Sequence, residues 1–485
     1  MVKPSTNSIA LKNRLAHMIL LLAFATQASA WDWWPLPMAA PDTCRDSLFY
    51  VGEIYAHASS GAQTPSLLWR NTHGNISLQP YAGTISAGVI KPATRPNRWF
   101  DYDFGIVLNG RFGGGQPGSG QTDITGYCSE LYAHARLYIV DITAGIHPIS
   151  FCPGDKELSV GGLLFSDNAH PIPRISVGFE RWTPIPGLFG YAEVKGGMSH
   201  GWLTDNAEGI KGTMLHHKYI GGRIGGKLPV NISYEFHHAA QWGGYSTKQG
   251  DLGNDWNSFK HIFLAKQGGS TKSDQLNAQG NHILSQTLCL TAKGDRWHLD
   301  IYWQDIQEDG RPRFLGKGQN SEDGLWGISA VQQHWPFIQG VTMEFFNTTD
   351  QSGPWHDRDG FVFGGADGYY QNSSYPQGWT YYGRIIGLPV CTPNNSRVMG
   401  GNVGVKGDIY GFRYRFQCTH AYNLGTYSQR AESANTAVLL EVKKIVPQAW
   451  NMEFGLSLAG DFGTQYGNTF GAMITIRKQG LITSW

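Results

Sequence analysis

Hydrophobic and polar residues alternate with a period of two along most of the chain, from about residue 48 to the C-terminus. Between residues 100 and 109, aromatic and aliphatic side chains at the even positions alternate with Asp101, Asp103 and residues that are largely polar or small. The same alternation occurs in 297–304 and 450–459. Successive residues of a β-strand point to opposite faces, so each predicted strand has one apolar face and one largely polar face.

The alternation predicts an all-β chain of about 18 antiparallel strands. We expect the strands to begin near Leu48, Gln79, Trp99, Cys128, Ile142, Arg174, Leu188, His216, Val230, Ile283, Trp297, Gly324, Gly340, Arg397, Ile409, Thr436, Trp450 and Asn468. With an even number of antiparallel strands, both chain termini lie at the same end of the barrel, the periplasmic end, as in single-chain outer-membrane barrels.

The connections between these strands differ in length in a regular way. Short turns rich in Pro or Gly are predicted at 183–187, 226–229, 293–296, 335–338, 406–408 and 446–448. Much longer connections lie around 241–282 and 348–396. Short periplasmic turns opposite long extracellular loops are typical of a transmembrane outer-membrane β-barrel, whereas alternation alone would also fit a soluble β-sandwich.

Composition supports a single barrel domain over residues 48–485 and excludes several classes of function. Aromatic residues make up 13% of the chain, charged residues only 15%, and the formal net charge is +1. A chain without a basic field is not expected to bind nucleic acid. The part that follows the N-terminal segment has no apolar run long enough for a transmembrane helix.

The N-terminus has the organisation of a cleaved signal peptide, predicted over residues 1–30. Lys3, Lys12 and Arg14 precede a short apolar run at 18–25, and Ala28 and Ala30 form a small-x-small cleavage site. Residues 31–47 are expected to form an irregular periplasmic leader. The chain is therefore predicted to be exported to the outer membrane of a Gram-negative-type cell.

The predicted last strand carries a pattern that the barrel assembly machinery reads. Asn468, Gly471, Ile474 and Ile476 fit the polar, glycine and apolar spacing of terminal barrel strands, although the chain continues to Trp485. The assembly machinery is therefore an expected partner, together with outer-membrane lipid and lipopolysaccharide, and the barrel is expected to be a monomer.

Several motifs occur in order along the chain, and together they point to a known family. They are Ser-Asp-Asn-Ala-x-Pro-Ile-Pro (166–173), Gly-x-x-His-Gly-Trp (197–202), His-His-Lys-Tyr (216–219), Asn-x-Ser-Tyr-Glu-Phe-His-His (231–238) and Asp-Gln-Ser-Gly-Pro (350–354). Through these motifs, nearly all of the mature chain resembles the capsule assembly protein family Wzi.

The resemblance implies an 18-stranded barrel that binds capsular polysaccharide as a lectin and anchors the capsule to the cell surface. It implies no enzymatic activity and no cofactor. It also implies a small helical bundle at the periplasmic mouth, yet the segment before the first predicted strand is too short for one. That bundle is either missing or lies partly in the turn at 91–98, which leaves open whether the lumen is closed on that side.

Polysaccharide binding requires flat aromatic faces surrounded by fixed polar groups, and the long loops supply both. The candidate residues are Trp202, Asp205, Asp255, Trp256, Asp274, Gln275, Trp355, His356, Asp357, Arg358 and Asp359. The alternative reading is that these side chains fold the loops onto one another and plug the lumen.

Other chemistry receives weaker support from the sequence. Asp357, Asp359 and Gly360 could begin a calcium turn but lack further spaced acidic ligands. The pairs 216–217 and 237–238 cannot each chelate a metal, because adjacent strand residues face opposite ways. The six cysteines form no C-x-x-C pair, so a zinc site is not expected and their pairing stays open.

Two rival functions remain open at this stage. A polar lumen also fits a porin or channel for small solutes. An outer-membrane hydrolase would need a triad such as Ser166, His216 and Asp357, but no G-x-S-x-G or H-E-x-x-H motif supports one.

Overall fold

The computed structural model describes residues 46–94, 99–114, 122–205, 207–271, 274–275, 278–308, 322–351, 357–358, 361–362 and 368–485. The predicted signal peptide and most of the predicted leader lie outside these residues, as does part of the turn at 91–98 that could hold a periplasmic bundle. The predicted domain boundaries therefore stay predictions.

Eighteen long strands form the wall of a closed antiparallel β-barrel. They are β1 (Ser47–Ser59), β2 (Tyr81–Lys91), β3 (Phe100–Gly114), β4 (Thr122–Leu137), β5 (Val140–Ile146), β6 (Pro173–Pro184), β7 (Ala192–Trp202), β9 (Met214–Ile224), β10 (Val230–Trp242), β13 (Asn281–Gly294), β14 (Trp297–Gln304), β16 (Gly324–Gln332), β17 (Gly340–Asn347), β22 (Val398–Ile409), β23 (Phe412–Gly425), β24 (Arg430–Val446), β25 (Met452–Gly463) and β26 (Thr469–Ser484). A two-residue strand, β15 (Gln307–Glu308), extends the wall beside β13.

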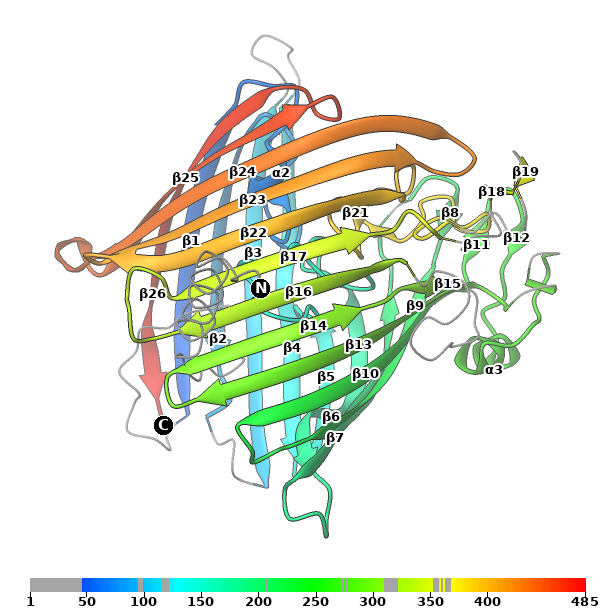
Figure 1. The fold of residues 1–485 in the computed structure, drawn as a ribbon, viewed down its shortest axis with the longest axis horizontal. Coiled ribbons are helices and arrows are strands. Elements are labelled where there is room, and N and C mark those ends of the chain that lie inside the picture. Colours follow the sequence, from blue (N-terminus) through cyan, green and yellow to red (C-terminus); the bar gives the residue numbers. More distant parts are fainter. Residues whose placement is uncertain are drawn as a thin grey trace, which may run out of the picture.

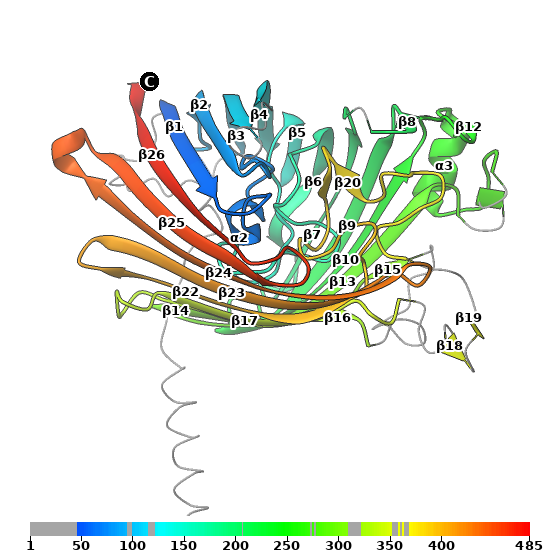
Figure 2. The same cartoon turned by 90° about the horizontal axis from the view of Figure 1, so that it is seen from above.

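The barrel closes because its first and last strands pair with each other. Ile54 of β1 lies opposite Ile85 of β2 on one side and opposite Ile476 of β26 on the other. Figures 1 and 2 show β1 in blue beside β26 in red. Closure leaves no unpaired sheet edge, which is the condition for a β-structure to span a membrane. The predicted fold class is confirmed.

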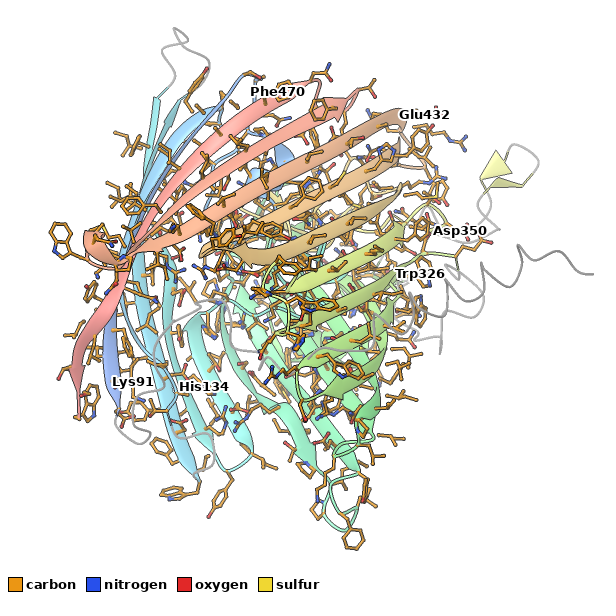
Figure 3. All side chains as sticks on the ribbon, turned by 60° about the vertical axis from the view of Figure 1, so that its left-hand side comes forward. Lys91, His134, Trp326, Asp350, Glu432 and Phe470 are labelled. Atoms are coloured by element: carbon orange, nitrogen blue, oxygen red, sulfur yellow. The ribbon has the colours of Figure 1, made fainter. Side chains whose placement is uncertain are left out.

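The period-two pattern divides the side chains between the two faces of the wall. On β3, Leu108 is 59% exposed on the outer face, whereas the neighbouring Val107 is only 4% exposed on the lumen side. Asp101 and Asp103 also point inward and are buried. The side chains of both faces are drawn in Figure 3, where Phe470, 58% exposed, marks the outer face. The outer face is therefore apolar and the lumen polar, as predicted.

The two ends of the barrel differ in the length of their connections, as predicted from the sequence. One end has short turns such as 138–139 and 410–411, and the other has long loops such as 243–280 and 348–397. Exposed aromatic residues occur at the short-turn end, namely Trp99, Tyr138, Phe189, Trp335, Tyr410 and Trp450. A ring of this kind lies at the membrane interface of outer-membrane barrels.

Most observed strands begin within a few residues of the predicted positions, and β4, β7 and β24 are the exceptions. β24 begins at Arg430, six residues before the predicted Thr436. β4 begins at Thr122, six residues before the predicted Cys128, and it continues through a register shift at Val107/Leu108 that leaves Ser129 outside the pairing. This bulge interrupts the alternation that the prediction relied on. β7 begins at Ala192, because Leu188 belongs to an exposed turn.

The remaining described elements are short. They are α2 (Ser66–Trp69), α3 (Trp256–Leu264), the single-turn helix η3 (Pro447–Ala449), and the two-residue strands β8 (Ile210–Lys211), β11 (Tyr245–Ser246), β12 (Gly250–Asp251), β18 (Asp357–Arg358), β19 (Phe361–Val362), β20 (Thr380–Tyr381) and β21 (Arg384–Ile385). None of the helices in the described ranges is both long and apolar enough to cross a membrane.

Candidate functional site

Segments of three long loops fold into the lumen and pack together: 60–80, 147–172 and 368–397. The apolar side chains of 147–172 and 368–397 form one buried cluster with wall residues, in which Leu163 and Trp379 from the loops meet Tyr302 and Phe346 from the wall. All four are at most 3% exposed. Segment 60–80 contributes Leu67, Leu68 and Ile76 to a second buried cluster against other wall strands. We call these three segments the plug.

Backbone and side-chain hydrogen bonds join the loops of the plug. The Trp379 indole N–H donates to the Leu164 carbonyl at 3.0 Å, and Ser166 donates from its hydroxyl to the Gly387 carbonyl at 2.6 Å. Arg384 donates to the carbonyls of Trp69 and Ile76. Each loop therefore satisfies backbone groups of another loop, which buried chain requires.

Glu344, on β17, binds the plug to the barrel wall. One carboxylate oxygen accepts from the Ser159 hydroxyl (2.7 Å) and the Tyr302 hydroxyl (2.7 Å). The other accepts from the Val160 amide (2.6 Å) and the Asn402 side chain (2.8 Å). A buried carboxylate with donors on both oxygens fixes the loop against three strands of the wall, β14, β17 and β22.

The motif at 166–173 lies inside this plug. Besides the Ser166 contacts, Asn168 donates from its side-chain amide to the Ile385 carbonyl at 3.0 Å, and the Asp167 carbonyl accepts from the His73 amide at 2.6 Å. The motif at 166–173 therefore holds the loops of the plug together. Its observed contacts are those of loop residues that fill the lumen, and not those of a surface that binds a ligand.

Burial in the plug suppresses charge on several of its titratable groups. Burial lowers the pKa of His73 to about 3 and raises the pKa of Asp167 to about 7. Their side chains are 3.9 Å apart. Since burial disfavours the charged form of each, this contact contributes little as an ion pair.

A cavity of about 490 Å³, open to solvent, lies between the plug and the periplasmic turns. Its wall carries both signs of charge, with Arg413, Arg415 and Lys443 near Glu441 and Glu453. Arg415 lies 3.3 Å from Glu441, and Lys443 lies 2.9 Å from the same carboxylate. Among the described residues, the periplasmic half of the lumen is therefore polar and contains this cavity, and the plug fills the extracellular half.

A small cavity of about 70 Å³ lies between loop 147–172 and the wall. Phe151 of the loop lies edge-on to His217, Tyr219 and His237 of the wall, with ring centroids 5.0–5.4 Å apart. The His217 and His237 rings are stacked at 5.4 Å. These contacts are those of a packed aromatic interface between plug and wall.

Two of the predicted tryptophans belong to one aromatic cluster at the extracellular end of the wall. Trp202, 40% exposed, packs edge-on against His200 at 5.3 Å. His200 contacts Phe259 at 6.0 Å, and Phe259 stacks on Trp256 at 5.3 Å. Trp256 is 69% exposed. The structure thus connects residues that lie more than fifty positions apart in the sequence.

Asp205 lies beside the hairpin of β20 and β21. Its carboxylate accepts a hydrogen bond from the Tyr382 amide at 2.9 Å, and burial raises the pKa of this carboxyl group. Next to it, the hydroxyls of Thr204 and Tyr381 are hydrogen-bonded at 2.7 Å. The Tyr382 ring is 55% exposed, so a fixed carboxylate and a solvent-facing aromatic ring adjoin each other here.

The other predicted polar residues of this region hold loop 243–280 in shape. Asp255 caps the N-terminus of α3 by accepting from the Ser258 amide at 2.8 Å, and this bond lowers the pKa of the carboxyl group. Asp274 is buried and accepts from the Gly280 amide at 3.2 Å. Gln275 is exposed and donates to the Gly269 carbonyl at 3.5 Å.

The remaining predicted residues lie largely outside the described part of the chain. Trp355, His356 and Asp359 are not among the described residues, and only the backbone of Asp357 and Arg358, in β18, is described. The calcium turn predicted at 357–360 falls in the same segment. These assignments remain predictions.

Sequence reasoning missed two exposed aromatic residues of the extracellular loops. Tyr245 is 61% exposed and Tyr382 is 55% exposed. Neither lies in a motif, and tyrosine is common throughout the strands. The available signal was the run Tyr381-Tyr382-Gly383-Arg384, whose glycine has a φ of +69° and allows a tight turn that presents Tyr382.

The histidine pairs behave as the strand geometry predicted. His216 points outward and contacts Phe259 at 5.4 Å, whereas His217 points inward toward Phe165 at 4.7 Å. Across the described ranges, no three His, Cys, Asp or Glu side chains are grouped so as to hold a metal ion. The five cysteines in those ranges are unpaired.

Two members of the conceivable hydrolase triad are separated by the barrel wall. Ser166 lies in the plug and donates to the Ile386 and Gly387 carbonyls, whereas His216 lies on the outer face. A nucleophile and its base must lie within hydrogen-bonding reach of each other. Ser166 and His216 therefore do not form a catalytic pair.

The fold resembles that of known outer-membrane proteins. Wzi of Escherichia coli, described as an outer membrane protein involved in group 1 capsule assembly and a carbohydrate-binding β-barrel, matches with a TM-score of 0.54 and 13% identity, over 98% of this chain and 89% of Wzi. OccK7 (OpdD) of Pseudomonas aeruginosa matches with a TM-score of 0.47 and 10% identity, over 91% of this chain and 100% of OccK7.

OccAB2 of Acinetobacter baumannii matches with a TM-score of 0.46 and 9% identity, over 90% of this chain and 98% of OccAB2. No protein-family model and no curated protein sequence matches this chain. At these identities the likeness to Wzi shows the fold, that of a Gram-negative outer-membrane barrel.

Proposed function

We propose that this chain binds capsular polysaccharide at its extracellular end and helps to hold the capsule at the cell surface. The observation that carries the proposal is the Asp205 carboxylate, which is fixed by the Tyr382 amide beside the exposed Tyr382 ring, at the mouth of a barrel whose extracellular half is filled. The exposed ring of Trp202, three residues before Asp205 in the chain, lies at the same end of the barrel. Aromatic faces contact the C–H surfaces of sugars, and a fixed carboxylate accepts from sugar hydroxyls.

The likeness to Wzi supports the same ligand class and a place in the same family. Wzi is described as a carbohydrate-binding barrel involved in capsule assembly. The motifs at 166–173 and 216–219 carry the sequence resemblance to that family, and the first lies in the plug. A non-enzymatic role follows from this proposal, as do lipopolysaccharide and the barrel assembly machinery as partners of a monomeric barrel.

The plug also argues against free diffusion of solutes through the lumen. Its three loop segments are hydrogen-bonded to one another, and segment 147–172 is also bonded to Glu344 on the wall. The rival function, a small-solute channel, is supported by the cavity of about 490 Å³ below the plug. Conductance across a planar bilayer separates the two, because a plugged barrel passes little current.

Binding of purified capsular oligosaccharide to the detergent-solubilised chain tests the proposal. We expect Trp202→Ala and Tyr382→Ala each to weaken binding by about three- to tenfold, from the energy of one aromatic contact. Trp335→Ala is the matched control, because Trp335 is 46% exposed at the opposite end of the barrel. The proposal fails if wild-type protein binds no capsular glycan, or if all three variants bind equally well.

The other residues predicted to contact glycan are not needed for this proposal. Trp355 lies outside the described residues, and Trp355→Ala in the same assay tests whether its loop contributes. Asp255 and Asp274 act through the shape of loop 243–280, so their replacement is expected to alter that loop first.

A further inference from the structure

The helix α3 lies on the outside of the barrel wall. On β9 and β10, residues with even numbers point outward, as the exposed Ile220 (59%) and Ile232 (55%) show. His216 of β9 and Trp242 of β10 therefore also lie on the outer face. Both contact Phe259 of α3, with ring centroids 5.4 Å and 5.6 Å apart, respectively. Figures 1 and 2 show α3 at the same end of the barrel as β8 and β12.

One side of α3 is fixed to the wall. Ile262 is fully buried in a cluster with Ala240 and Trp242 of β10. Lys218 of β9 donates to the Phe263 carbonyl at the C-terminal end of the helix, and its ammonium lies 4.0 Å from the centroid of the Phe263 ring. The helix therefore has a defined orientation relative to the wall.

The opposite side of α3 presents a stripe of apolar and basic residues. Trp256 is 69% exposed, Leu264 is 55% exposed, and Lys260 between them is exposed. These residues are spaced by four positions, so they lie on one face of the helix. The helix itself contains no Asp or Glu, and the exposed Lys266 follows it.

The helix also lies directly above the apolar belt of the wall. Ile220 follows His216 by four residues on β9, which places this exposed isoleucine about 13 Å along the strand from the helix contact. The belt continues downward to Ile224, which is 74% exposed. α3 therefore lies on the outer face of the wall, at the extracellular end of the strands that carry the apolar belt.

We propose that α3 is an interfacial helix that contacts phosphate-bearing lipid of the outer leaflet. Trp256 and Leu264 lie at the boundary between headgroups and acyl chains, and Lys260 binds a headgroup phosphate. Tryptophan is enriched at such boundaries, and a lysine near an anionic bilayer surface is attracted to it. The proposal goes beyond glycan binding and removes Trp256 from the glycan surface.

Hydrogen–deuterium exchange of residues 256–264 in the full-length protein tests this proposal. The protein is reconstituted into nanodiscs of phosphatidylcholine alone or of phosphatidylcholine with phosphatidylglycerol. We expect phosphatidylglycerol to slow exchange of this helix about fivefold in the wild type, and Lys260→Gln to abolish the slowing. Free inorganic phosphate, added to nanodiscs of phosphatidylcholine, is expected to have no effect.

Lys248→Gln is the matched control, because Lys248 is an exposed lysine of the same loop outside α3. It should respond to phosphatidylglycerol as the wild type does. Equal slowing in Lys260→Gln and wild type, or no slowing in either, would overturn the proposal. Slowing by capsular oligosaccharide in place of lipid would also overturn it and would return Trp256 to the glycan surface. Because glycan binding is also measured on Tyr382, whose described ring contacts are with His170 and Tyr381, outside α3, failure of one proposal leaves the other standing.

Discussion

Glu344 should control whether the lumen stays closed. Its carboxylate accepts four hydrogen bonds, two of them from loop residues Ser159 and Val160 and two from wall residues Tyr302 and Asn402. Glu344→Ala removes every acceptor at once. The two hydroxyl groups can rotate toward other acceptors, but the Val160 amide and the Asn402 side chain are held by their surroundings.

The magnitude follows from the two N–H donors that remain. A buried donor left without a partner costs about 1–3 kcal/mol, so the plug is expected to lose about 2–6 kcal/mol of its stability in the lumen. A loss at the upper end of this range would increase the population of a displaced loop by several thousandfold or more. Transient opening of a barrel with a polar lower lumen should then become measurable.

Planar-bilayer recording of single molecules is the assay. Wild-type protein should show little current, and Glu344→Ala should show bursts of conductance together with faster hydrogen exchange at residues 158–166. Glu432→Gln is the control, because Glu432 lies at the extracellular end (Figure 3) and accepts one exposed hydrogen bond from Tyr422. Unchanged current and unchanged exchange in Glu344→Ala would refute the role assigned to this carboxylate.

Two further predictions concern contacts of the plug. Asp323, directly before β16, accepts a hydrogen bond from the Tyr369 hydroxyl of segment 368–397 at 2.9 Å. Burial raises the pKa of Asp323 to about 7, so this group favours folding while it is protonated. Stability should therefore fall by up to about 4 kcal/mol as the pH rises from about 4 to about 7, and Asp323→Asn should flatten a plot of melting temperature against pH. Arg384→Met removes donors to the Trp69 and Ile76 carbonyls and should destabilise loop 60–80 by about 2–4 kcal/mol. Limited proteolysis should then cut this loop faster than in the wild type, and equal cutting rates would contradict the prediction.

The barrel could be predicted because alternation is a local property of each strand. Lipid outside the barrel and a polar lumen inside it require alternate side chains to be apolar and polar. From the alternation alone, Glu235 between Tyr234 and Phe236 is expected to point into the lumen and to pair with a basic residue, and its carboxylate lies 2.7 Å from the Lys195 ammonium. Prediction failed where local geometry breaks the period, as at Ser129 in a bulge, or where apolar residues such as Leu188 lie in an exposed turn.

The loops could not be predicted to the same depth, because their contacts join distant parts of the chain. Nothing near Asp205 in the sequence indicates that it receives the Tyr382 amide, 177 residues later. Asp255 is the opposite case. An acidic residue just before a helix is a recognisable N-cap, so its structural role could have been read from the sequence.

The way in which loop 60–80 is anchored has a consequence for biogenesis. Ser66, at the start of α2, donates from its amide and its hydroxyl to Asp461 of β25, both at 2.7 Å and across 395 residues of chain. These bonds form only when the N-terminal loop and the penultimate strand meet. β26 lies between β25 and β1, so the bonds cross the seam at which the barrel closes. Closure of the seam and anchoring of loop 60–80 are therefore coupled, and a chain that leaves the seam open also leaves this part of the plug unanchored.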